Sequence, residues 1–82
     1  MVTKVTVYST PTCPWCDKVK EFLTENKIKY TNIDVSEDTA KAQEMVRKSG
    51  QMGVPVTIIS KDGKETIIIG FDKDKIAKTL RL

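Results

Sequence analysis

The chain has 82 residues, of which 30% are charged, and a formal net charge of +3. This length is enough for one domain over residues 1–82 but not for a deep substrate cavity, so we expect a shallow active site. The lysines alternate with acidic residues along the chain, a pattern that does not favour nucleic-acid binding. Histidine is absent, which excludes cysteine–histidine and serine–histidine catalysis and histidine metal sites within the chain.

The first residues lack a basic stretch followed by an apolar run, and no segment approaches the roughly 18 apolar residues of a membrane span. We therefore expect a cytoplasmic protein with no membrane partner, and nothing in the sequence demands more than a monomer. The cytosol is reducing and does not favour structural disulfides. The two cysteines, Cys13 and Cys16, consequently need another explanation.

Hydrophobic periodicity predicts strands over residues 2–8, 28–35, 56–60 and 65–69, with three helices between and after them. The first helix is predicted to begin at Pro14 and to run to about residue 26, because proline suits the first helical position. Ser36 is expected to cap the second helix, with Glu37 and Asp38 in its first turn, and Gly50 to end it. A third helix follows, capped by Asp72.

The predicted order of elements is β-α-β-α-β-β-α. The first β-α-β should be a right-handed parallel unit, and the Asp62-Gly63 pair predicts an antiparallel hairpin. Residues 67–69 are apolar on both faces of their strand, so helices must cover both faces of the sheet. The apolar positions expected to face the core from the helices are Cys16, Val19, Phe22 and Leu23 in the first, Ala42, Met45, Val46 and Ser49 in the second, and Ile76, Ala77 and Leu80 in the third.

The two cysteines differ in their expected environments. Cys13 should be the N-cap of the first helix, with its sulfur accepting a hydrogen bond from the Cys16 N–H. The helix dipole also favours the thiolate, so we expect an exposed Cys13 with a lowered pKa. Cys16 should be more buried. This division predicts that Cys13 attacks a substrate disulfide and Cys16 resolves the mixed disulfide, leaving a Cys13–Cys16 bridge.

Other interpretations of the pair remain open. Two cysteines could be half of a zinc site, but four ligands would then require a dimer. They could also be buried structural cysteines, although a capping cysteine before proline is poorly placed for burial. Trp15 could be a surface aromatic residue or a contact surface beside the nucleophile. On spacing alone, Pro55 is an ordinary trans proline at the start of a strand.

Three segments resemble the glutaredoxin family of the thioredoxin fold: residues 8–16 with Cys13-Pro14-Trp15-Cys16, then Gly53-Val54-Pro55, then Ile69-Gly70-Phe71-Asp72. The resemblance implies a three-layer α/β/α sandwich, with a four-stranded mixed sheet in the order 2-1-3-4 and three helices. It also implies a cis Pro55 beside the cysteines, where the backbone of Val54 can pair with an extended substrate.

Two positions depart from glutathione-using members of the family. Thr10 stands where these members commonly carry lysine, and Phe71 where they usually carry a second glycine. Gly70-Phe71 is similar to the glutaredoxin-like redoxins that serve ribonucleotide reductase and draw electrons from thioredoxin reductase. Phe71 adds bulk where the γ-glutamyl end of glutathione would lie, while Thr10 and Asp72 can offer polar contacts.

The sequence thus predicts a dithiol oxidoreductase of protein disulfides, with ribonucleotide reductase as one candidate substrate. It would have no tightly bound cofactor and would be re-reduced by a thioredoxin-reductase-type flavoenzyme. One alternative is a glutathione-dependent glutaredoxin that also removes glutathione from modified thiols. Another is a dimeric zinc or iron–sulfur module. The expected substrate-binding residues are Thr10, Trp15, Val54, Pro55, Gly70, Phe71 and Asp72.

Overall fold

A computed structural model describes residues 3–51, 53–61 and 63–80. Its elements are β1 (Thr3–Ser9), α1 (Pro14–Glu25), β2 (Thr31–Asp34), α2 (Thr39–Ser49), β3 (Val56–Lys61), β4 (Lys64–Ile69) and α3 (Lys73–Leu80). The sheet order is β2-β1-β3-β4, with β1 parallel to β2 and antiparallel to β3, and β4 antiparallel to β3. The predicted mixed sheet with three helices is confirmed.

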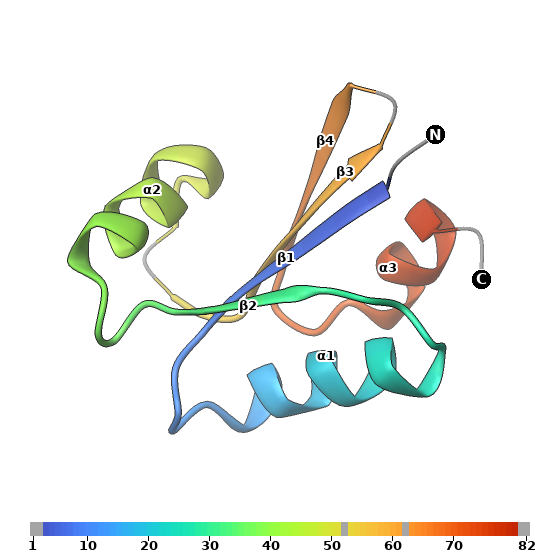
Figure 1. The fold of residues 1–82 in the computed structure, drawn as a ribbon, viewed down its shortest axis with the longest axis horizontal. Helices are drawn as coiled ribbons and strands as arrows, with labels where there is room; N and C mark the ends of the chain where they lie inside the picture. Colours follow the sequence, from blue (N-terminus) through green and yellow to red (C-terminus); the bar gives the residue numbers. More distant parts are fainter. Residues whose placement is uncertain (1–2, 52, 62, 81–82) are drawn as a thin grey trace.

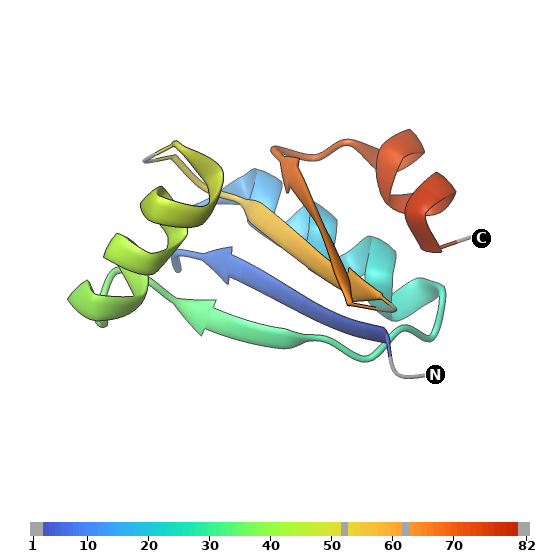
Figure 2. The same cartoon turned by 90° about the horizontal axis from the view of Figure 1, so that it is seen from above.

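The helices form layers on both faces of the sheet, with α1 and α3 on one face and α2 on the other (Figures 1 and 2). Alternate strand residues therefore enter two separate cores. The core beneath α1 and α3 consists of Val5, Val7, Val19, Leu23, Ile59, Ile68 and Ile76. The core beneath α2 is smaller and consists of Tyr8, Met45, Val56 and Ile58.

The β3–β4 hairpin forms where the Asp-Gly pair predicted it. Gly63 has φ +80°, a conformation that glycine adopts without strain; Asp62, like Val2 of the first predicted strand, lies outside the described residues. β4 is an edge strand. The Lys75 ammonium of α3 donates a hydrogen bond to the Ile67 carbonyl of this strand, at 3.4 Å.

The second helix begins later than predicted. Ser36 is not its N-cap, because the Ser36 N–H and hydroxyl both donate to the Asp34 carboxylate, at 2.9 and 2.6 Å. Asp38 caps the helix instead and accepts a hydrogen bond from the Lys41 N–H at 3.1 Å. Glu37 and Asp38 therefore precede the first turn. Gly50 ends the helix with φ +71°, as predicted.

Two further expectations need correction. The second strand is shorter than residues 28–35, because only Thr31–Asp34 pair alongside β1. Val46 does not join the core: it is 36% exposed, because the buried side of α2 is centred on Met45. Phe22 packs against the core under α1 and α3 as predicted, and it is half-buried because it lies at the margin of that core.

Candidate active site

The start of α1 positions Cys13 as predicted. Cys13 has an extended backbone, with φ −101° and ψ 105°, and Pro14 occupies the first turn of the helix. The Cys13 N–H donates to the Thr10 carbonyl at 3.4 Å, which closes the turn after β1. The Cys16 N–H donates to Cys13 Sγ at 3.1 Å. A helix N–H and the positive end of the helix dipole thus both point at this sulfur.

Cys13 and Cys16 form a disulfide bond, with their Cα atoms 5.2 Å apart. The Cys16 side chain is fully buried. Cys13 is half-buried, not exposed as expected, because its sulfur is bonded to this buried partner. Cys13 thus keeps part of its surface exposed while Cys16 is enclosed, which is the arrangement that two-step thiol–disulfide exchange requires.

Pro55 lies at the same end of the sheet as the cysteines, since Tyr8 of β1 pairs with Val56 of β3. The Val54–Pro55 peptide bond is cis, as the resemblance implied. The Gly70 N–H donates to the Pro55 carbonyl at 2.9 Å. This bond joins the loop before β3 to the turn after β4, so residues predicted from separate motifs lie next to each other.

An aromatic cluster extends from the disulfide along α1. The Phe71 ring centroid lies 6.4 Å from that of Trp15 and 6.3 Å from that of Phe22. Trp15 is 58% exposed, and the Lys73 ammonium lies 5.7 Å from the Phe22 ring centroid. Phe71 therefore packs against α1 at both Trp15 and Phe22. Phe22 and Phe71 also line an open groove of about 200 Å³ along α1, which neither cysteine lines.

The two polar residues of the predicted site have different surroundings. Thr10 lies in the turn that precedes Cys13, and its carbonyl accepts the Cys13 N–H. The Asp72 carboxylate is the N-cap of α3 and accepts a hydrogen bond from the Lys75 N–H at 3.1 Å. Asp72 thus holds the helix start that follows Phe71.

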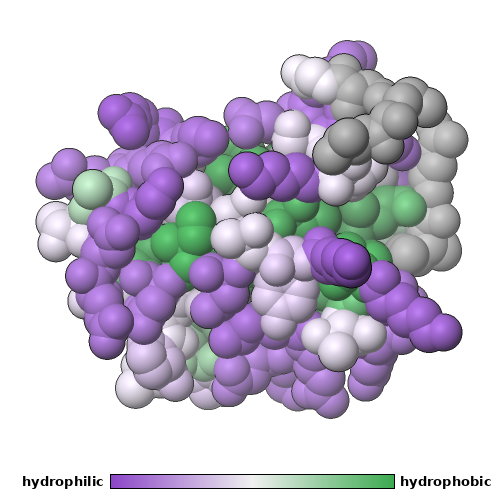
Figure 3. Space-filling view, in the orientation of Figure 1, coloured by the Kyte–Doolittle hydropathy of each residue, from purple (hydrophilic) through white to green (hydrophobic). Residues whose placement is uncertain are grey.

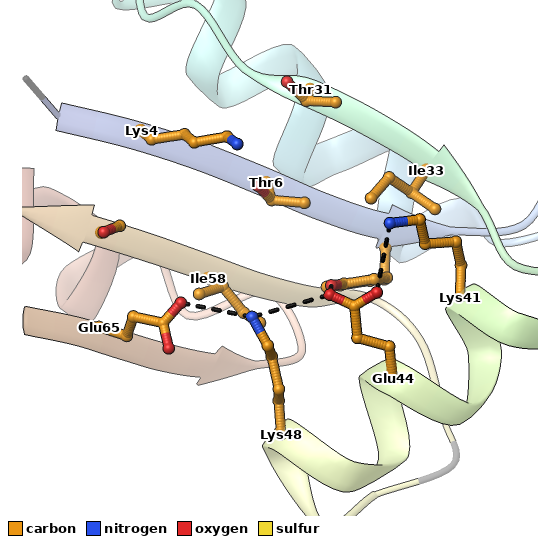
Figure 4. A pocket seen from close by; sticks show the side chains of 11 residues that line it. Lys4, Thr6, Thr31, Ile33, Lys41, Glu44, Lys48, Ile58 and Glu65 are labelled. Atoms are coloured by element: carbon orange, nitrogen blue, oxygen red, sulfur yellow. Dashed lines mark hydrogen bonds and ion pairs between the residues drawn. The ribbon is translucent and has the colours of Figure 1, made fainter.

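A second cavity, of about 400 Å³, lies on the opposite face of the sheet, beside α2 (Figure 4). Glu44 points into it and forms ion pairs with Lys41 at 3.3 Å and with Lys48 at 3.7 Å. Lys48 also pairs with Glu65 of β4 at 3.4 Å. The Tyr8 hydroxyl donates to Glu44 at 3.3 Å. The network ties α2 to both β1 and β4.

The electrostatics of this network follow from its contacts. The hydrogen bond from Lys41, together with the charges of Lys41 and Lys48, lowers the pKa of Glu44. Burial and the neighbouring Glu44 carboxylate raise the pKa of Tyr8. Sequence analysis missed this cavity. The three- and four-residue spacings of Lys41, Glu44 and Lys48 indicate the pairs along one helix, but no local pattern indicates Glu65.

Charged and polar side chains cover most of the face seen in Figure 3, with smaller apolar areas between them. Within residues 3–51, 53–61 and 63–80, no helix combines the length and the apolar character needed to cross a bilayer.

Comparison with known proteins agrees with this geometry. The family model described as Glutaredoxin matches residues 5–64. A glutaredoxin-like 8.6 kDa protein in the rubredoxin operon of Clostridium pasteurianum is 45% identical over 76 residues, covering 93% of this chain and 96% of that protein. The crystal structure of the glutaredoxin from Methanosarcina mazei Go1 superposes with a TM-score of 0.81 at 31% identity, covering 96% of this chain and 79% of that one.

The glutaredoxin-like protein NrdH-redoxin from Escherichia coli, described as having a thioredoxin-like activity profile, superposes with a TM-score of 0.75. The two are 25% identical, and 92% of each chain is covered. The match of the family model over most of the chain, the disulfide at the start of α1 and these relatives lead to one conclusion. The chain belongs to the glutaredoxin family.

Proposed function

We propose that this protein is a dithiol electron carrier that reduces protein disulfides and is itself re-reduced by a thioredoxin-reductase-type flavoenzyme. Its family and the Cys13–Cys16 disulfide support thiol–disulfide oxidoreductase chemistry. Phe71, which packs between Trp15 and Phe22, is the main support for this electron donor. We place the reaction in the cytosol, where the reduced form of such a pair persists.

The reaction proceeds in two exchanges. The Cys13 thiolate attacks one sulfur of the substrate disulfide, so that a Cys13–substrate bond forms and the first substrate thiolate leaves and takes up a proton. Cys16 then loses its proton and attacks Cys13 Sγ, forming the Cys13–Cys16 bond and releasing the second substrate thiolate. Two electrons pass to the substrate. The flavoenzyme returns two electrons and restores both thiols.

The bulk of Phe71 disfavours the binding of glutathione. The Phe71 ring occupies the turn between β4 and α3 and is in contact range of two other aromatic rings. A ring held by neighbours on both sides does not move aside without losing that packing, which is worth about 0.5–1.5 kcal/mol per aromatic pair. The thioredoxin-like activity profile described for NrdH-redoxin from Escherichia coli supports the same choice.

We assign substrate binding to the surface around Cys13. The exposed Trp15 ring offers an apolar contact beside the accessible sulfur. The Val54 backbone, ahead of cis Pro55, would pair with an extended segment of the substrate, in the way that a strand adds to a sheet. Large interfaces of this kind suit a polypeptide better than a tripeptide. Ribonucleotide reductase is one candidate.

Two coupled assays test the proposal. The oxidised protein is offered NADPH with thioredoxin reductase, and separately NADPH with glutathione and glutathione reductase, with a protein disulfide as the final acceptor in both. We expect turnover in the first assay and at least about tenfold less in the second, the ratio that about 1.4 kcal/mol of discrimination produces. Turnover only with glutathione would contradict the proposal. So would a zinc-loaded or visible-absorbing dimer with no turnover in either assay.

A further inference from the structure

Thr57 carries a buried hydroxyl that forms no hydrogen bond. Its side chain is fully buried in the middle of the sheet. Among the described residues, Thr57 Oγ1 is the one buried side-chain oxygen or nitrogen that lacks a hydrogen-bond partner. Nearly all such groups in folded proteins are paired, because an unpaired buried hydroxyl loses its hydrogen bonds to water without replacement. A hydroxyl kept at this cost needs an explanation.

The register of the sheet locates this hydroxyl. Thr57 lies between Val7 of β1 and Ile68 of β4, and both neighbours belong to the core beneath α1 and α3. Since Thr57 shares their side of the sheet, it faces α1. β1 leads through a short turn into α1, so the start of this helix covers this end of the sheet (Figure 2).

The side chain of Cys16, from the first turn of α1, lies in the same interface between this helix and the sheet. Its side chain is fully buried and lies one helical turn before Val19, which packs in the core with Val7 and Ile68. A second hydroxyl on this side of the sheet, that of Ser9, already donates to the Asn32 side-chain oxygen. The Ser9 hydroxyl therefore does not compete with that of Thr57 for a hydrogen-bond partner in this interface.

We propose that Thr57 is a positioning residue for Cys16, and that its hydroxyl donates a hydrogen bond to the Cys16 sulfur in the dithiol form of the protein. This inference rests on the resolving role proposed for Cys16. In the disulfide, the Cys16 sulfur is bonded to Cys13 and carries no charge. Reduction breaks that bond and leaves Cys16 as a thiol that can ionise, and its thiolate is a much better hydrogen-bond acceptor than the disulfide sulfur, in a place that water does not reach.

The hydrogen bond acts on the second exchange of the reaction. As Cys16 attacks the mixed disulfide, its proton passes to the solvent, which balances the proton that the substrate thiolate later takes up, and the buried thiolate needs a hydrogen-bond donor nearby. Thr57 supplies that donor and keeps its own proton. The Cys13–Cys16 bond then forms, the Cys13–substrate bond breaks, and the substrate thiolate takes up a proton from solvent. The Thr57 hydroxyl returns to its unpaired state.

The consequence is a difference between the two redox states. Thr57 destabilises the disulfide form slightly and stabilises the dithiol form. Thr57→Val removes the hydroxyl and nearly preserves the shape of the side chain, so the variant is expected to fold. Thr57→Ser retains the hydroxyl and removes only a methyl group. Thr6→Val is the matched control, because Thr6 lies on the adjacent strand, opposite Ile58, on the other face of the sheet.

The test measures the dithiol–disulfide equilibrium of each variant in dithiothreitol redox buffers, by alkylation and mass spectrometry. For Thr57→Val we expect the equilibrium constant for reduction to fall about fivefold, the effect of one hydrogen bond, or about 20 mV for a two-electron couple. Release of substrate from a mixed disulfide at Cys13 should slow by about the same factor. The oxidised variant should melt no lower than the parent protein, and Thr57→Ser should stay within about twofold of the parent in both measurements.

Three results would overturn the inference. One is an unchanged equilibrium and release rate in Thr57→Val. Another is a Thr57→Ser variant that behaves like Thr57→Val, which would assign the effect to packing. The third is the same effect in Thr6→Val. These measurements use neither reductase, so an error in the proposed electron donor would appear in the coupled assays and leave this test intact.

Discussion

The Cys16 N–H donates a hydrogen bond to Cys13 Sγ over 3.1 Å, within the same helical turn that joins the two sulfurs. The helix start therefore supports negative charge on one sulfur while the other is enclosed by the core. This asymmetry distinguishes the two cysteines although only two residues separate them.

Serine substitutions should separate the two roles. Cys13→Ser should lower the rate of protein-disulfide reduction on the order of a thousandfold or more, because the remaining thiol, that of Cys16, is fully buried and cannot reach a substrate disulfide. Cys16→Ser should instead accumulate a covalent Cys13–substrate adduct, detectable by mass spectrometry, and retain some activity toward glutathionylated substrates. An active Cys13→Ser and an inactive Cys16→Ser would reverse the assignment.

Replacing Phe71 should change the electron donor. Phe71→Gly opens the space between Trp15 and Phe22, and we expect turnover with glutathione and glutathione reductase to rise about tenfold, as about 1.4 kcal/mol of new binding energy gives. Phe71→Leu retains most of the bulk and is the matched control. Equal glutathione turnover in the parent protein, Phe71→Leu and Phe71→Gly would show that bulk at this position does not exclude glutathione.

The Glu44 network predicts a dependence of stability on pH. The pKa of Glu44 is lowered from its ordinary value of 4.5, first by the hydrogen bond from Lys41. A lowered folded-state pKa means that the carboxylate stabilises the fold above pH 4.5, and that this stabilisation is lost as the pH falls further, through the folded-state pKa. Glu44→Gln should therefore lower the urea midpoint at pH 7 and have a diminishing effect in acid.

Urea titrations of the parent protein and of Glu44→Gln between pH 3 and 7 make this comparison. Glu37→Gln is the control, because Glu37 is exposed and the described residues show no ion pair to it. A constant difference between Glu44→Gln and the parent over the whole range would contradict the assignment of the effect to ionisation.

The cap of α2 can be tested separately. Asp38→Ala removes the acceptor for the Lys41 N–H and should lower the free energy of unfolding by about 1 kcal/mol, as loss of an N-cap usually does. Asp38→Asn preserves the acceptor and should cost much less. If Ser36→Ala proves more destabilising than Asp38→Ala in urea denaturation, Ser36 is the more important residue at this helix start.

Features set by neighbouring residues could be predicted from the sequence. Pro14 predicts the start of α1 and, with it, Cys13 as the cap. By the same short-range logic, Asp72 predicts the start of α3 and Gly50 the end of α2. Three expectations resting on the family resemblance agree with the structure: the fold, the sheet order and cis Pro55. The roles assigned to the substrate-binding residues stay predictions.

Features set by competition or by distant partners could not be predicted. Ser36 is a good cap by composition, but Asp34 binds its N–H and hydroxyl, and this moves the helix start to Asp38. The ion pair between Lys48 and Glu65 joins a helix to a strand 17 residues away. The unpaired hydroxyl of Thr57 is likewise a property of the assembled core, since threonine is common in strands.

The contact between Lys75 and the Ile67 carbonyl bears on how copies of the protein behave when concentrated. An outermost strand carries unused backbone groups, which can recruit another chain and seed polymerisation. At Ile67 one of these acceptors is already taken by a charged side chain from α3. An incoming strand would have to displace an ammonium group and place its own backbone near that charge. We therefore expect Lys75 to make strand addition at the β4 edge less favourable, independently of any redox chemistry.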